Sequence, residues 1–217
     1  MSGIGEITRP RARAALVTAA LAATCGSVAT GVAPAAACLT APVAVRPTAS
    51  VATAYVINQG DNTVTPINTT TNTAGPPVKV GQSPDAIAIT PNGATAYIAN
   101  SGSRSVTPIK TATNTAGKPI SVGHTPVAVA ITPNGATAYV VNKNSNTVTP
   151  INTATNKAGA AIGTGVVPDA IAITPNGATA YVADWSVNTV TPVNTANNTP
   201  GPTIKVGQQP TVIAITP

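Results

Sequence analysis

Apolar and polar positions alternate in short runs from residue 52 onward, and each run ends at a turn signal. Side chains of a strand point alternately to its two faces, so this period of two predicts β-strands, and no window shows the 3.6-residue period of a helix. The Asn134-Gly135 pair after the first run suggests a tight type I′ hairpin turn, which needs positive φ at both residues. The expected strands of one unit span 127–132, 136–142, 146–152 and a short run near 161–162.

These runs recur with a fixed period of 42 residues. The four tyrosines Tyr55, Tyr97, Tyr139 and Tyr181 keep this spacing, and the string ITPNGATAY is repeated unchanged at 89–97, 131–139 and 173–181. Four strands in about 42 residues is the period of a β-propeller blade. The sequence therefore predicts an all-β fold, a β-propeller of four 42-residue, four-stranded blades in residues 52–217, with units starting near 52, 94, 136 and 178.

The repeated strings also resemble a known family. AYVIN, AYIAN, AYVVN and AYVAD, followed by NTVTPIN and a T-x-T-N turn, are similar to the YVTN family of β-propeller repeats of secreted and cell-surface prokaryotic proteins. The resemblance covers about three quarters of the chain and implies the fold and an extracellular setting. It is unspecific for activity, because related propellers include lactonases and lyases.

How the ends of the repeat meet is left open by the sequence. The repeats begin with a second strand, at 52–58, and end with a first strand, at 211–217, which could complete the first blade and close the ring. A degenerate first strand at 42–45 would compete for that place. Since YVTN-type propellers commonly have about seven blades, three outcomes remain: a four-bladed ring, a homodimer that completes a larger ring, and a truncated arc.

A proline recurs in the middle of each expected third strand, at positions 66, 108, 150 and 192. Proline has no N–H for the hydrogen bonds of a sheet. We expect either a short fourth strand or a bulge at this position.

The leading residues have a different pattern. Three arginines precede an uncharged stretch that ends in Ala35-Ala36-Ala37, which predicts a signal peptide over 1–37 and a secreted or cell-surface protein. An uncleaved anchor helix is the alternative. Residues 38–51 are expected to be a linker or the degenerate strand, and Ala-Ala-Ala-Cys38 resembles a lipobox, which makes Cys38 a candidate lipid anchor.

Composition excludes several classes of function. Of 217 residues, 43% are apolar and 7% charged, and the formal charge of +6 comes partly from the leading arginines. A nucleic-acid binder would concentrate basic residues and aromatic residues on one face, so no nucleic-acid partner is expected. Phosphate-binding glycine motifs do not occur in the sequence, and no cofactor is implied.

Few residues could carry acid–base or metal chemistry. After residue 37 the chain has one histidine, His124, four aspartates and no glutamate. Asp85 and Asp169 occupy the same position in units two apart, so a closed four-bladed ring would place them across the channel, where they could hold a cation such as Ca²⁺. The plainer alternative is two solvated carboxylates at strand starts.

The loops between second and third strands vary most among the units. In a propeller they lie on the same rim as Gln82, His124 and Asp169, and a rim of varied loops on a rigid scaffold is a typical binding surface. We expect a noncatalytic extracellular binding or cell-surface interaction module for a protein or glycan; a lactonase- or lyase-type enzyme and a fragment without independent activity are the alternatives. The candidate binding residues are Asp61, Arg104, His124, Lys143, Asp184 and Trp185.

Overall fold

The computed structural model describes residues 52–217, all of them within the compact unit Pro47–Pro217. These residues form four antiparallel sheets, and the only helix among them is one 3-10 turn, Lys143–Ser145. The all-β prediction is confirmed. No helix in this part of the chain has the length and hydropathy needed to cross a membrane. The expected signal peptide, Cys38 and the degenerate strand at 42–45 lie outside the described residues.

Each sheet is built from consecutive strands of one unit, as the 42-residue period predicts. Within residues 52–217 the first sheet has no first strand, and its order is β1-β2-β3 with β4 also paired to β2. In the other three sheets an additional strand precedes this set and pairs with the counterpart of β1. The strands of the first two sheets are β1 (Thr53–Asn58), β2 (Thr63–Asn68), β3 (Thr73–Ala74), β4 (Val78–Lys79), β5 (Pro84–Ile89), β6 (Thr95–Asn100), β7 (Ser105–Lys110), β8 (Thr115–Ala116) and β9 (Ile120–Ser121).

The third and fourth sheets repeat this arrangement. Their strands are β10 (Pro126–Ile131), β11 (Thr137–Asn142), β12 (Thr147–Asn152), β13 (Lys157–Ala158), β14 (Ile162–Gly163), β15 (Pro168–Ile173), β16 (Thr179–Asp184), β17 (Thr189–Asn194), β18 (Thr199–Pro200) and β19 (Ile204–Lys205).

The recurring proline explains why the outermost strand is split into two short pieces. Pro108 lies opposite Tyr97 in the β6–β7 ladder, and its carbonyl accepts a hydrogen bond from the Gly117 N–H at 2.7 Å on the other side. Its missing N–H therefore faces the outer edge, where strand pairing is interrupted between β8 and β9. Of the two alternatives, the short fourth strand is the correct one.

The hairpin after each first strand differs from the expected type I′ turn. Gly135 has φ +73°, whereas Asn134 is not among the residues with positive φ. The Gly135 N–H donates to the Thr132 carbonyl at 2.8 Å, which makes residues 132–135 a type I turn with Pro133 at its second position. The type I′ prediction is wrong because the Asn134 side chain accepts hydrogen bonds from Thr132 and the Ala136 N–H, which stabilises a longer loop.

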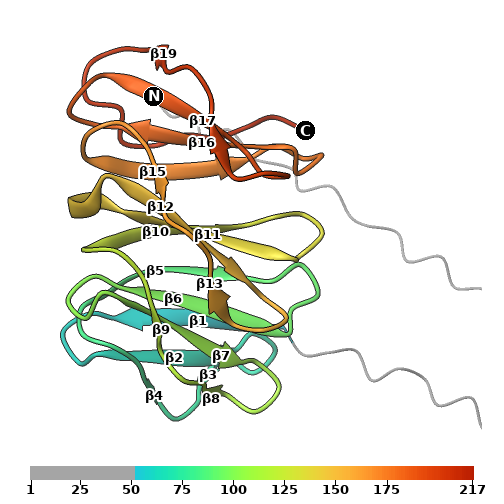
Figure 1. Cartoon of the computed structure of the whole chain (residues 1–217). Helices are drawn as coiled ribbons and strands as arrows, with labels where there is room; N and C mark the ends of the chain where they lie inside the picture. The colour runs from blue at the N-terminus through green and yellow to red at the C-terminus, as the bar shows by residue number, and fades with distance from the viewer. Residues whose placement is uncertain (1–51) are drawn as a thin grey trace, which may run out of the picture. The chain divides into compact units, whose positions relative to one another are not determined.

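The core lies between neighbouring sheets rather than within one. Tyr97 and Val106 of the second sheet pack against Ala138, Val140 and Ile151 of the third. Equivalent clusters join the first sheet to the second and the third to the fourth. The sheets thus follow one another in chain order, as Figure 1 shows by the colours from β1 to β19.

Each contact between sheets also contains one tyrosine hydroxyl group. The Tyr97 hydroxyl donates to Asn156 Oδ1 at 2.7 Å, on the T-x-T-N turn of the next sheet. Tyr55 and Tyr139 make the same bond to Asn114 and Asn198. Burial raises the pKa of these three tyrosines, so the hydroxyl stays a donor at neutral pH.

The C-terminal residues do not complete the first sheet of their own chain. Residues 211–217 form no strand in the structure, and Val212 is 82% exposed. The reason is position: the C-terminus lies near the fourth sheet, and β1 is at the opposite end of the succession (Figure 1). The expectation that residues 211–217 close one chain into a ring is therefore not met.

Candidate functional site

The loops between second and third strands form one rim together with the linkers between sheets. We call this surface the loop rim; it consists of loops 59–62, 101–104, 143–146 and 185–188 and linkers 81–83, 123–125, 165–167 and 207–209. Backbone hydrogen bonds join linker 81–83 to the loop of the second sheet, where Ser101 N–H donates to the Ser83 carbonyl at 2.9 Å. Equivalent bonds join the next two linkers to the following loops. These bonds give the variable residues a rigid base.

In the first three sheets an asparagine amide at the end of the second strand lies under the loop and donates to hydroxyl groups of the third strand. Asn142 is fully buried, and its Nδ2 donates to Thr147 Oγ1 at 3.2 Å and Thr149 Oγ1 at 2.8 Å. Its Oδ1 accepts the Gly123 N–H at 3.1 Å. A side chain at Gly123 would meet Asn142 Cγ at 2.7 Å, so only glycine allows the linker to approach this closely.

Asp184 takes the place of this asparagine in the fourth sheet. The carboxylate is fully buried, with Thr191 Oγ1 donating to Oδ2 at 2.6 Å and Thr189 Oγ1 at 3.2 Å, whereas Oδ1 has no partner. Burial raises the pKa of Asp184, and the threonine hydrogen bonds act in the opposite direction. Because its side chain is buried, Asp184 is not an exposed binding residue. The prediction that Asp184 is a binding residue is therefore wrong, and its side chain instead supports the loop that carries Trp185.

Arg104 departs from a structural pattern that the other units keep. Asn62, Asn146 and Asn188 occupy the same position with φ between +53° and +57°, and each side chain accepts a linker N–H. Arg104 has φ +51° but no side-chain acceptor for its linker. Left-handed backbone is costly for arginine and cheap for asparagine. Arg104 thus has a strained backbone, and the residue is exposed on the loop rim.

Four other candidate residues also lie on this rim. Asp61 and His124 are exposed, and Trp185 and Lys143 are half-buried. The His124 N–H donates to Ser145 Oγ at 2.7 Å, which ties the histidine linker to the Lys143 loop. Trp185 contacts the preceding linker through its backbone, with its N–H donating to the Val167 carbonyl at 3.0 Å.

The two aspartates proposed for a cation are in different settings. Asp169 Oδ1 forms an ion pair with Lys143 Nζ at 2.7 Å, and Asp85 is exposed at the second residue of β5. No hydrogen bond or ion pair joins the two aspartates in the described part of the chain. Among residues 52–217 no three His, Cys, Asp or Glu side chains come close enough to hold a metal ion. The ion pair gives Asp169 a role in joining the third and fourth sheets.

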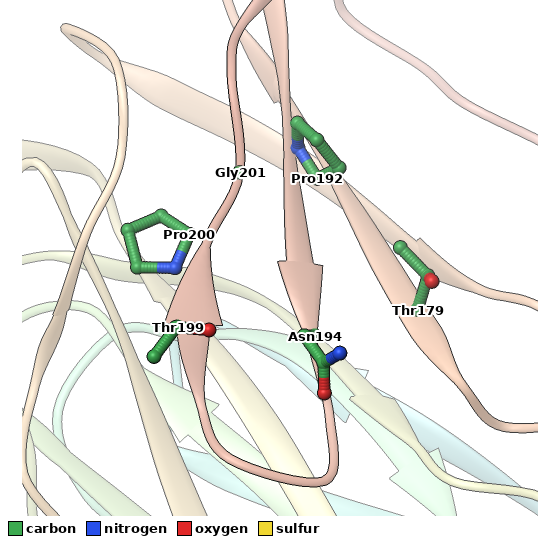
Figure 2. Close-up of a pocket in the computed structure, with 6 residues that line it drawn as sticks. All are labelled: Thr179, Pro192, Asn194, Thr199, Pro200 and Gly201. Carbon is green, nitrogen blue, oxygen red and sulfur yellow. The ribbon is translucent and has the colours of Figure 1, made fainter.

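The opposite rim varies less from unit to unit. We call it the turn rim; it carries the PNG turns and the T-x-T-N turns, which Thr153 Oγ1 joins by donating to the Gly135 carbonyl at 2.6 Å. Figure 2 shows a hollow of about 300 Å³ beside β17 and β18, lined by Pro192, Asn194 and Gly201 among others. Equivalent residues line hollows of about 230, 270 and 340 Å³ in the other sheets. A hollow that accompanies every split outer strand is a feature of the fold.

Sequence reasoning missed the left-handed residues of the loop rim. Ser83, Thr125, Val167 and Gln209, each just before a proline, have φ between +48° and +58°. Val167 is a β-branched residue for which this conformation is a clear outlier. No residue type marks the position, because it holds four different amino acids.

Comparison with known proteins identifies the fold but no family. No family model matches the chain, and no curated protein is similar to it. Among solved structures, the chain is similar to hydrazine synthase of Kuenenia stuttgartiensis, with 29% identity and a TM-score of 0.66 over 70% of this chain and 45% of that one. A functionally unknown protein from Desulfotomaculum acetoxidans has 21% identity and a TM-score of 0.68 over 75% and 55%.

These neighbours are of propeller type, so residues 52–217 have a β-propeller-like, all-β fold with four sheets as blades. The chain spans about half the length of each neighbour that it matches.

Proposed function

We propose that this protein is a noncatalytic binding module of the bacterial cell exterior that recognises a protein or glycan with its loop rim. The observation that carries the proposal is the contrast between the rims. The turn rim repeats its PNG turns unchanged and its T-x-T-N turns with one change, at Asn197, and differs otherwise mainly at Lys110 and Lys157. The loop rim differs from unit to unit in most of its charged and aromatic residues, on a base whose backbone hydrogen bonds recur. Variation on a rigid scaffold is typical of recognition surfaces.

Arg104 and Trp185 are the proposed anchors. Arg104 occupies a left-handed position at which asparagine would accept a linker N–H, so the residue contributes less to stability there than asparagine would. Trp185 is the only tryptophan, and tryptophan and arginine are enriched among residues that dominate binding energy. Exposed His124 and half-buried Lys143 add basic groups nearby.

The extracellular setting is part of the proposal and follows from the leader-like residues 1–37 and the resemblance to YVTN repeats. The same leader makes attachment through Cys38 a proposal for how the module stays at the surface. A lactonase- or lyase-type activity would have to use a single histidine and four aspartates among residues 52–217.

The test compares two basic residues at the two ends of β7, Arg104 on the loop rim and Lys110 on the turn rim. The labelled full chain is applied to an array of bacterial and host glycans and to intact bacterial cells. We expect Arg104→Ala to reduce binding by about tenfold, because a central arginine contributes 1.4 kcal/mol or more. Lys110→Ala, which changes an exposed cation at the turn rim, should leave binding unchanged.

Equal losses in the two variants would contradict recognition by the loop rim. Hydrolysis of a lactone by the protein, at a rate that Arg104→Ala does not change, would favour the enzymatic alternative. Trp185→Ala is the second variant, and its thermal unfolding is measured alongside because the side chain is half-buried.

A further inference from the structure

A hollow of about 500 Å³ lies beside β1. Ala52, Tyr55, Ile89 and Gly93 are among its lining residues. At the corresponding turns of the third and fourth sheets, side chains placed at Gly135 and Gly177 would meet Pro91 at 3.5 Å and Pro133 at 3.3 Å. A side chain at Gly93 would meet no atom of residues 52–217 within 4 Å. Pro91 and Pro133 each come directly after the run of residues that contains the first strand of their sheet.

The missing cover matches a segment of the same repeat. Among the described strands, β1 pairs with β2 alone, whereas β6, β11 and β16 each pair with a first strand as well. Residues 211–217, TVIAITP, have the sequence of such a first strand, and Pro217 stands three periods of 42 after Pro91. In the structure this segment forms no strand and is largely exposed.

The outer faces of the first and fourth sheets are also complementary. Val56 is 44% exposed on the first sheet, although its counterpart Val140 is fully buried against the preceding sheet. On the fourth sheet Ile204 is 47% exposed, whereas its counterpart Ile162 is 5% exposed. These two faces repeat the two sides of the contact that already joins the inner sheets three times.

The tyrosine bond between sheets has the same two unused halves. Within residues 52–217, the Tyr181 hydroxyl has no hydrogen-bond partner, and no tyrosine donates to Asn72, although its three counterparts each accept from a tyrosine. Within residues 52–217 one end thus carries a tyrosine donor without an acceptor, and the other end carries an asparagine to which no tyrosine donates. This surface requires a partner whose face repeats the contact made inside the unit.

We propose that this partner is a second copy of the chain, arranged head to tail, with residues 211–217 of each copy pairing with β1 of the other. Each segment would fill the hollow at Gly93, and the fourth sheet of each copy would pack on the first sheet of the other. Two copies make two identical junctions and so close the assembly. A second copy fits better than the same chain, because the C-terminus lies at the far end of the succession from β1 (Figure 1).

The inference is independent of the loop rim and of any ligand.

The experiment measures the mass of the full chain by analytical ultracentrifugation over a range of concentrations. We expect a species of two copies that dissociates on dilution. Val56→Asp should convert it to single copies, because it places a charge on a face that is buried only in the pair. Ala214→Pro should do the same by preventing strand pairing of the C-terminal segment. Val187→Asp, at a residue of the loop rim that is 41% exposed, is the matched control and should leave the pair intact.

Three results would overturn the proposal. If the unaltered chain is a single copy at every concentration, the proposal is wrong. Protection of the β1 amides from hydrogen exchange in such single copies would mean that residues 211–217 pair with β1 of their own chain. A pair that resists both Val56→Asp and Ala214→Pro would show that another surface joins the copies. Masses that grow beyond two copies would exclude the closed pair.

Discussion

Asp184 shows how one atom exchange changes the energetics of a repeated position. Its counterparts are asparagines whose Nδ2 donates to two hydroxyl oxygens, whereas Asp184 can only accept from Thr189 and Thr191. Oδ1 of Asp184 is buried without a partner, as is Oδ1 of Asn100, so the charge of the carboxylate is what distinguishes Asp184. Burying a charged group without its full set of hydrogen bonds lowers stability more than burying a neutral amide in the same place.

We therefore expect Asp184→Asn to stabilise the protein at neutral pH by about 1 kcal/mol, or about 2–4 °C in Tm. Burial raises the pKa of Asp184, so the folded state binds a proton more tightly than the unfolded state. The free energy of unfolding of the unaltered protein thus falls as pH rises from the ordinary pKa of 3.8 through the raised pKa. Thermal unfolding at a series of pH values should show the gain at pH 7 and little gain below pH 3.8.

The reciprocal variant is the control. Asn142→Asp introduces the carboxylate at a position with the same two hydroxyl partners, and it should destabilise the protein at neutral pH and less in acid. A pH-independent effect of Asp184→Asn would contradict burial as the cause.

The tyrosine bond between sheets gives a second prediction at the scale of residues. Tyr97→Phe removes a buried hydroxyl that donates to Asn156 Oδ1, and we expect a loss of about 1 kcal/mol in the free energy of unfolding. Tyr181→Phe should change stability by much less at low protein concentration, because the Tyr181 hydroxyl has no partner within residues 52–217. Urea unfolding of both variants compares the two. Equal losses would mean that Tyr181 has an acceptor within its own chain.

At the scale of elements, the outer strand of each sheet is shaped by a proline and a glycine together. A side chain at Gly159 would meet Pro150 Cγ at 3.2 Å, whereas Gly163, in β14 of the same sheet, has nothing within 4 Å. We expect Gly159→Ala to destabilise the protein by about 1 kcal/mol, since the proline ring is rigid. Gly163→Ala should be neutral or slightly stabilising. Thermal unfolding measures both, and a neutral Gly159→Ala would show that the outer strand can move away from the proline.

The same elements show how far the sequence could predict the structure. The strands and their order follow from alternation and period, since each unit solves the same local problem. The type I turn at Pro133 was missed because Asn-Gly favours two turn types and the Asn134 side-chain bonds decide between them. The burial of Asp184 was missed because its loop position suggested exposure, although the three asparagines in its place hinted at a structural role.

At the scale of the whole described unit, the contribution of a side chain to stability depends on whether its sheet lies at an end or in the middle of the four. In a repeat protein each unit contacts its neighbours only, so stability is close to a sum over units and interfaces. The sequence could predict how many units there are. It could not predict how they end, because that depends on the angle between sheets, which is set by packing across three interfaces.

Ile67 and Ile151 both lie in a strand of sequence TVTPIN, one in the first sheet and one in the third. A difference between their variants therefore reports the position of the sheet and not the local sequence. Ile151 is fully buried, and Ile151→Ala should lower the free energy of unfolding by about 2–5 kcal/mol at any protein concentration. Ile67 is half-buried on the outer face of the first sheet, so Ile67→Ala should have a clearly smaller effect at low concentration, where copies are apart. Its effect should grow with concentration as a second copy covers that face, because binding to the folded state adds to stability by mass action. Unfolding followed by Trp185 fluorescence at several concentrations measures this difference, and equal effects at the lowest concentration would mean that one chain covers its own outer face.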